Sequence, residues 1–221
     1  MPRIVSTLVG VALLTCSGRA DWQRDFPVDL KALATSGTSP YFPLRPGAAQ
    51  ILEYDTRKLV ITVLHQTRMV DGVETRVVEE RETEGETLIE ISRNFFALDP
   101  ATRNLYYFGE EVDHFRDGRV ADHEGSWLAG EAGARFGLFL PGDPHPGYRF
   151  YQEQAPGIAL DRAEILELGL VWGSDAGRFN GCIRLRETTP LEPGAREEKV
   201  YCPGIGLVQD GDLKLTGFTA P

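Results

Sequence analysis

Apolar residues in this chain fall in short segments, and turn-forming residues separate one segment from the next. The segment 59–64 (LVITVL) is rich in β-branched residues, which are typical of strands. Further segments that predict strands are 77–78, 88–91, 105–108, 148–154, 165–172, 181–188 and 207–215. From residue 41 onward the pattern therefore predicts strands joined by turns.

Two dipeptides predict tight hairpins between neighbouring strands. Asp71-Gly72 lies between Val70 and Val73, and Asp117-Gly118 lies between Arg116 and Arg119. Asp-Gly is typical of two-residue hairpin turns, because both positions adopt positive φ. The 14 prolines and 24 glycines of the chain fit frequent turns. Most strands should thus pair antiparallel with a neighbour in sequence.

A meander of amphipathic strands can bury one face in few ways: as a closed barrel, as a half-barrel curled around a helix, or as a sandwich. A short helical segment is predicted at 30–34, within the mixed N-terminal segment 21–40. It favours the curled sheet. The fold class expected is mainly β, an antiparallel curled sheet (half-barrel or barrel-like) with little helix, and residues 41–221 form its single domain.

The first twenty residues have the layout of a secretory signal peptide. Arg3 precedes the apolar run 4–14, and Ala20 supplies a small residue before Asp21. The run is too short to span a bilayer, and no later segment is long and apolar enough. We expect cleavage after Ala20 and a periplasmic or secreted protein. The alternative is a lipoprotein that is lipidated at Cys16.

The charge of the chain excludes several classes of partner. The formal net charge is −10, and removal of Arg3 and Arg19 with the signal peptide makes it −12. A surface this negative repels phosphate backbones and anionic lipid headgroups, so we expect no nucleic-acid partner. An apolar ligand, a periplasmic protein or a metal cation remains compatible with the charge.

Cys182 and Cys202 are the cysteines that remain after the signal peptide. The segments 181–186 and 198–202 flank a turn at 190–194, and a hairpin centred near Glu192 places the two sulfurs opposite each other. In an oxidising compartment such a pair is typically bonded, and closing this loop stabilises the fold by about 3 kcal/mol. The alternative is two buried thiols.

Two C-terminal stretches carry a resemblance. The stretch 175–194 contains AGRFNGC and ETTPLEPG, and the stretch 198–208 reads EKVYCPGIGLV. They resemble a family of uncharacterised bacterial secreted proteins with AG-x-F…C, ETTPLEPG and Y-x-PG-(I/V)-G-L-V motifs, which is distantly similar to the LolA/LolB-like half-barrels. Cys202 departs from the family, which has Ala before its Pro-Gly. The resemblance implies export and a curled sheet, and it implies no activity.

A cluster of carboxylates is predicted on the hairpin that turns at Asp117-Gly118. A two- or four-residue loop pairs Asp113 with Asp122 and Glu111 with Glu124, so all four side chains share one face. Opposed like charges are destabilising, and a bound Ca²⁺ would offset the repulsion. Salt-screened exposure is the ordinary alternative, and a three-residue loop would dissolve the cluster.

The same register places His114 and His123 together on the opposite face of this hairpin. With Asp143 and His145 from the turn at 143–146 they would form a Zn²⁺ or Cu²⁺ site. No pair of these histidines has the spacing of a known metal motif. Exposed or singly hydrogen-bonded histidines are the alternative.

Aromatic residues near this hairpin are candidates for a ligand pocket. Tyr106, Phe108 and Trp127 would line it, unless they fill a packed core instead. Glu111 and Glu124 are a candidate acid/base pair for a hydrolase. No other catalytic motif stands out.

These observations lead to three functional hypotheses. The preferred one is an exported, non-enzymatic binding or carrier-type protein for an apolar or amphiphilic ligand or a partner protein. The second is a divalent-cation-binding module built on the carboxylate cluster. The third is a hydrolase that uses the paired carboxylates.

Overall fold

The computed structural model describes residues 21–220, and within this range the structure is built of β-strands. A single 3-10 turn, Leu30–Ala32, lies where the short helical segment was predicted, and residues 21–220 contain no α-helix. The prediction of a mainly β, antiparallel, barrel-like fold is confirmed. The strands are β1 (Gly37–Ser39), β2 (Phe42–Leu44), β3 (Ala49–Tyr54), β4 (Arg57–Val70), β5 (Val73–Glu84), β6 (Thr87–Leu98), β7 (Leu105–Arg116), β8 (Arg119–Asp122), β9 (Trp127–Leu128), β10 (Arg135–Leu140), β11 (Arg149–Tyr151), β12 (Glu153–Gln154), β13 (Arg162–Ser174), β14 (Gly177–Thr188), β15 (Glu197–Cys202), β16 (Gly206–Asp210) and β17 (Leu213–Thr219).

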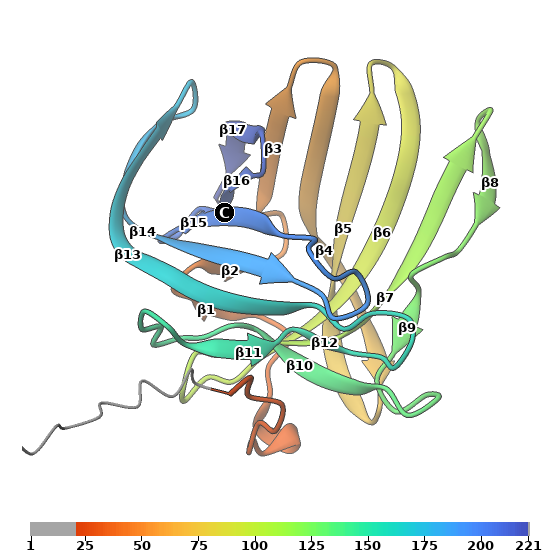
Figure 1. Ribbon diagram of the computed structural model, residues 1–221, viewed down its shortest axis with the longest axis vertical. Helices are drawn as coiled ribbons and strands as arrows, with labels where there is room; N and C mark the ends of the chain where they lie inside the picture. Colours follow the sequence, from red (N-terminus) through yellow and green to blue (C-terminus); the bar gives the residue numbers. More distant parts are fainter. Residues whose placement is uncertain (1–20, 221) are drawn as a thin grey trace, which may run out of the picture.

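One antiparallel sheet curls almost into a closed barrel (Figure 1). Its strand order is β11-β13-β14-β15-β16-β17-β3-β4-β5-β6-β7-β10-β12, so two meanders, β3–β7 and β13–β17, join where β17 pairs with β3. Strand β10 contacts β11, which brings the two ends of the sheet together without a ladder between them. The barrel is therefore nearly closed where β10 lies beside β11.

Both predicted Asp-Gly hairpins are present. Val70 pairs with Val73 across Asp71-Gly72, and Arg116 pairs with Arg119 across Asp117-Gly118. The four turn residues have φ between 48° and 76°, the left-handed conformation that this turn requires. Figure 1 shows the long hairpins β3–β4 and β5–β6 rising on one side of the molecule and the β13–β14 hairpin rising on the other.

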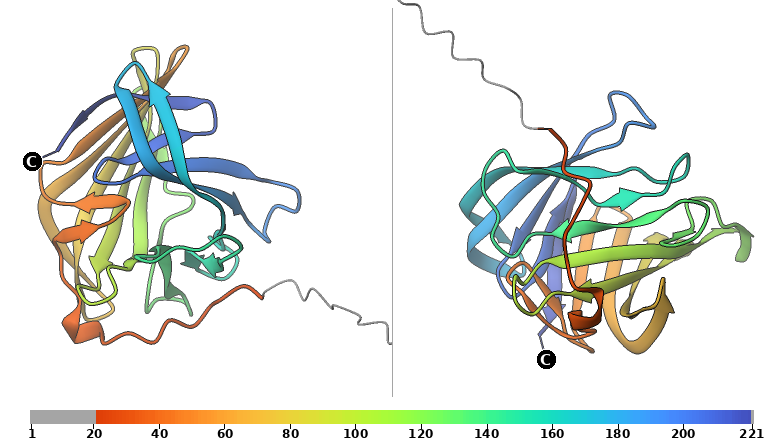
Figure 2. Two further views of the ribbon diagram at one scale, coloured as in Figure 1. Left: turned by 90° about the vertical axis from the view of Figure 1, so that its left-hand side faces the viewer. Right: turned by 90° about the horizontal axis from the view of Figure 1, so that it is seen from below.

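The N-terminal part of the described chain covers one end of the barrel. Gln23 bridges to Phe150 on β11, and Ala34 bridges to Leu98 on β6, so residues 23–34 cross from one side of the barrel to the other (Figure 2). The β1–β2 hairpin follows. Its Phe42 packs between Phe96 and Phe139, with ring centroids 5.9 and 6.0 Å away, and plugs this end with apolar side chains.

The predicted disulfide is present between β14 and β15. Cys182 and Cys202 are bonded, and the pairing of Ile183 with Tyr201 gives the register expected for a hairpin centred near Glu192. The bond fits an oxidising compartment outside the cytoplasm. The predicted signal peptide and Cys16 lie outside the described residues. Within residues 21–220, no helix has the length and hydrophobicity of a membrane span.

Candidate functional site: an acidic lumen

A β-bulge in β7 sets which side chains face the interior of the barrel. Tyr107 pairs with Phe96 and Glu110 pairs with Asn94, so two residues of β7 lie opposite one residue of β6. The extra residue, Gly109, has φ of 125°, and a Cβ there would lie 2.3 Å from the carbonyl oxygen of Trp127. Only glycine fits this position. The bulge turns both Tyr107 and Glu110 toward the lumen.

The floor of the lumen is aromatic. Phe96 stacks on Tyr107 with ring centroids 4.8 Å apart, and Phe139 lies 4.7 Å from Phe96 and 6.2 Å from Tyr201. These rings are almost fully buried against the plug residue Phe42, except that Phe139 is partly exposed. Burial of each such ring stabilises the fold by about 2–3 kcal/mol. The floor is therefore a rigid apolar surface.

The walls above this floor carry carboxylates. A cavity of about 180 Å³ is lined by seven acidic side chains and one lysine, together with the aromatic floor and the amides of Asn94 and Gln152. The acids come from six strands and one loop: Glu80, Glu90, Glu110, Glu153, Asp161, Glu187 and Asp210. The lumen is polar and strongly acidic, and it is not the apolar pocket that the sequence suggested.

Lys199 is the cation among these groups. Its Nζ lies 2.9 Å from Glu187 Oε2 and 3.5 Å from Asp210 Oδ2. Burial by itself lowers the pKa of Lys199, but the charges of Asp210 and Glu187 more than offset this and hold the pKa well above its usual value. Lys199 thus stays protonated and neutralises part of the acidic wall.

Glu80, Glu110 and Glu153 form no ion pair among the described residues, and they resist ionisation. Burial raises the pKa of Glu80 to about 7, although the charge of Lys199 opposes the rise, and burial together with the charge of Glu80 raises the pKa of Glu110 to about 8. Burial and the charge of Glu110 raise the pKa of Glu153 well above its usual value. Near neutral pH the lumen therefore holds several protons that a bound cation would displace.

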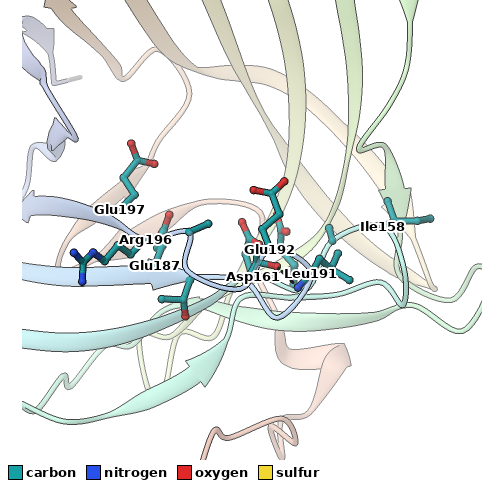
Figure 3. A pocket seen from close by; sticks show the side chains of 12 residues that line it. Ile158, Asp161, Glu187, Leu191, Glu192, Arg196 and Glu197 are labelled. Atoms are coloured by element: carbon teal, nitrogen blue, oxygen red, sulfur yellow. Dashed lines mark hydrogen bonds between the residues drawn. The ribbon is translucent and has the colours of Figure 1, made fainter.

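A second, larger cavity forms the mouth of the lumen. It has a volume of about 580 Å³ and shares Glu153, Asp161 and Glu187 with the inner cavity, so the two adjoin. Figure 3 shows Asp161, Glu187 and Glu192 gathered beside the β14–β15 loop, with Ile158 at the other end of the pocket. Ile158 and Leu191 are 47% and 43% exposed. The mouth thus combines acidic groups with an apolar rim.

The predicted carboxylate cluster of the β7–β8 hairpin does not form. Phe115 pairs with Val120 as expected, but a second irregularity then pairs His114, and not Asp113, with Asp122. The acids that face outward are matched by cations: Glu111 pairs with Arg68, and Asp113 with Arg93 at 3.1 Å. Glu124 is exposed. Because Glu111 and Glu124 are both exposed, no cleft encloses the acid/base pair of the hydrolase hypothesis.

The three histidines proposed as metal ligands are also separated. His114 faces the lumen side, 3.3 Å from Glu90, whereas His123 contacts Asp113 on the outer face at 2.9 Å. His145 stacks on Tyr148 in the β10–β11 connection. Across residues 21–220, no group of three or more His, Cys, Asp or Glu is arranged to hold a metal ion.

The aromatic residues predicted to line a pocket lie beside the lumen. Tyr106 and Phe108 point to the opposite face of β7, where both pack against Phe136. Trp127 is buried, packs edge-on against Tyr107 at 5.4 Å and lines a separate cavity of about 110 Å³. On β7 the aromatic residue that lines the lumen is Tyr107, because Tyr106 and Phe108 alternate to the other face.

The lumen acids were not identified from the sequence. Their signal is present in β5, where Glu80 and Glu82 continue the inward-facing positions of Val78. A run of acids on a stripe that begins as buried apolar residues indicates a polar interior. The same pattern also fits a strand that emerges into solvent, and only the curvature of the sheet distinguishes the two cases.

Comparisons with protein-family models, with curated proteins and with solved structures found no match to this chain.

Proposed function

We propose that this chain is an exported binding protein of the carrier type, and that its lumen takes up an amphiphilic ligand with a protonated amine. One observation carries the proposal: seven carboxyl side chains surround a cavity that contains one ammonium group, Lys199, above an aromatic floor. The excess of acid is a charge imbalance that a cationic ligand would neutralise.

The electrostatics favour a cation over a neutral or anionic ligand. A purely apolar molecule in this cavity would strip water from seven carboxyl groups without offering them a partner, which costs free energy. An anion would meet like charge. An ammonium group beside Glu80 and Glu110 would lower their raised pKa values and displace their protons.

The apolar parts of the site fit the rest of such a ligand. An ammonium group near Tyr107 and Phe96 gains a cation–π contribution of about 0.5–2 kcal/mol. An alkyl chain would leave the lumen over the apolar rim at Ile158 and Leu191. The mouth cavity, at about 580 Å³, lies within the usual range for small-molecule sites, roughly 300–1,000 Å³.

The proposal includes the location of the protein. The signal-peptide pattern and the Cys182–Cys202 bond support export to the periplasm or beyond the cell, after cleavage following Ala20. The resemblance of the stretches 175–194 and 198–208 to a family that is distantly LolA/LolB-like supports a carrier that holds its ligand inside a curled sheet.

Calorimetric titration with a matched set of ligands tests the proposal. Dodecylamine, dodecanol and dodecanoate share one chain length and differ in head group. At about pH 8 we expect saturable binding of dodecylamine only, with an affinity that rises from pH 6 to pH 8 as Glu80 and Glu110 ionise.

Neighbouring residues of β7 supply the control. Glu110→Gln should weaken dodecylamine binding about tenfold, because it removes one lumen charge, whereas Glu111→Gln on the outer face should leave binding unchanged. Equal binding of all three compounds, or equal loss in both variants, would contradict the proposal.

A further inference from the structure

The outer face of β13 and β14 carries a row of residues around an arginine that lacks an acidic partner. Register places Tyr151, Arg162 and Thr188 opposite one another on β11, β13 and β14. Their neighbours Ala163 and Glu187 point inward, so Arg162 and Thr188 face outward. Arg162 Nε donates to Thr188 Oγ1 at 3.2 Å, and within residues 21–220 no carboxylate lies within ion-pair distance of its guanidinium.

The adjacent row shows what a neutralised arrangement looks like on the same surface. Arg149 contacts Glu164 at 2.7 Å, and Arg186 contacts Glu198 at 3.2 Å, so cations and anions alternate across the strands. Arg162 lies outside this ladder. Its charge is therefore available to a ligand.

Aromatic side chains hold Arg162 in place. Its guanidinium carbon lies 4.3 Å from the ring centroid of Trp22 and 6.0 Å from that of Tyr151. Arg24 covers the same tyrosine at 4.1 Å and donates to its hydroxyl oxygen. A guanidinium fixed between rings loses little side-chain entropy when it binds, so the group is pre-organised.

A cavity of about 330 Å³ opens at this arginine. It is lined by Trp22, Arg149, Arg162, Arg186 and Thr188, with Asp21 and Glu164 also at its wall. Thr188 lines the mouth of the lumen as well, so this cavity adjoins the amine site but lies on the other face of the sheet. We name it the Arg162 pocket.

We propose that the Arg162 pocket binds the oxyanion of a small molecule, a carboxylate or a phosphate. The planar guanidinium presents two parallel N–H donors, which match two oxygens of such a group. The Thr188 hydroxyl accepts from Arg162 Nε and can donate its own proton to the same anion. Arg186, which shares Glu198 with Arg184, adds positive charge at the wall.

Anion titration at constant ionic strength tests this site. Inorganic phosphate and acetate replace chloride stepwise, and calorimetry and melting temperature report binding. We expect saturable binding of at least one of the two anions, and the anion that binds more tightly identifies the class. Arg162→Gln should weaken binding at least about tenfold, because the bidentate contact is lost.

Three further variants separate the outcomes. Arg184→Gln removes an arginine from the same face of β14 but outside the pocket, and it should leave binding unchanged. Thr188→Val, which leaves the Trp22 stack intact, should weaken binding several-fold. Glu110→Gln should have no effect, so failure of the lumen proposal does not affect this one.

Two results would overturn the inference. One is the absence of saturable binding for both anions. The other is an Arg162→Gln protein that melts earlier yet binds phosphate as the wild type does, which would assign Arg162 to the anchoring of the N-terminal segment only.

Discussion

Glu110 and Glu111 are neighbours in β7, yet their side chains lie in opposite electrostatic environments. Glu111 faces outward and pairs with Arg68, whereas Glu110 faces the lumen among other acids, and its pKa rises to about 8. The same division runs through the molecule: outer carboxylates such as Asp113, Glu164 and Glu198 each contact an arginine.

This comparison indicates which charged groups of the molecule remain available to bind a ligand. A surface acid in an ion pair contributes little to stability and attracts a ligand weakly, because its partner and the solvent already screen its charge. An unpaired acid in a confined cavity is costly to ionise, and a ligand cation recovers that cost. The unneutralised groups, the lumen acids inside and Arg162 outside, are therefore the candidate sites.

Removal of the β7 bulge should have the largest effect on this division. Gly109→Ala places a Cβ against the Trp127 carbonyl at a positive φ, and we expect a loss of about 4 kcal/mol in the free energy of unfolding. Urea denaturation measures it. Gly118→Ala has positive φ but open space around it, and should cost only about 1 kcal/mol. Similar losses in the two variants would mean that the structure relieves the contact with the Trp127 carbonyl at little cost in free energy.

Loss of the lumen cation should have the next largest effect. Lys199→Met leaves Glu187 and Asp210 without their partner, and at about pH 8 this should cost about 3 kcal/mol. Lys214→Met, on an exposed position of β17, is the control and should cost almost nothing. Chemical denaturation of the two variants makes the comparison.

The lumen acids should make the unliganded protein less stable as pH rises. The pKa values of Glu80 and Glu110 are about 7 and about 8 in the folded state, above the ordinary carboxyl value, so the folded state binds more protons between about pH 5 and pH 8. Stability should therefore fall through this window.

The variant Glu80→Gln, Glu110→Gln should flatten that pH profile and gain on the order of 2 kcal/mol at pH 8. Glu111→Gln should keep the wild-type slope. If the stability of the wild-type protein rose with pH, the lumen acids would ionise without penalty. The lumen acids and the outer acids would then not differ as described above.

The outer face should show the smallest effect. Asp113→Asn breaks the surface contacts with Arg93 and His123 and should cost about 0.2–1 kcal/mol. The cost should decrease in high salt. A loss above 2 kcal/mol would place these contacts in the same class as the lumen groups.

Much of the architecture could be predicted from the sequence, because it depends on local rules. Asp-Gly turns fix hairpins through their φ preference, as at Asp71 and Asp117, and the spacing of Cys182 and Cys202 about Glu192 fixes a register. The assignment of side chains to faces failed on β7, where bulges intervene. Strict alternation sends Tyr106 and Phe108 to the side of Glu110, and Gly109 reverses this.

Local sequence alone determined that this chain forms antiparallel strands, where two of its tight turns lie and which cysteines meet, since each depends on residues near one another in the chain. Tertiary structure alone decided which acids share the lumen, because Glu80, Glu110, Glu153, Glu187 and Asp210 come from separate strands. Only the curvature of the nearly closed sheet brings them around Lys199, and that curvature follows from pairings between distant segments, such as β17 with β3.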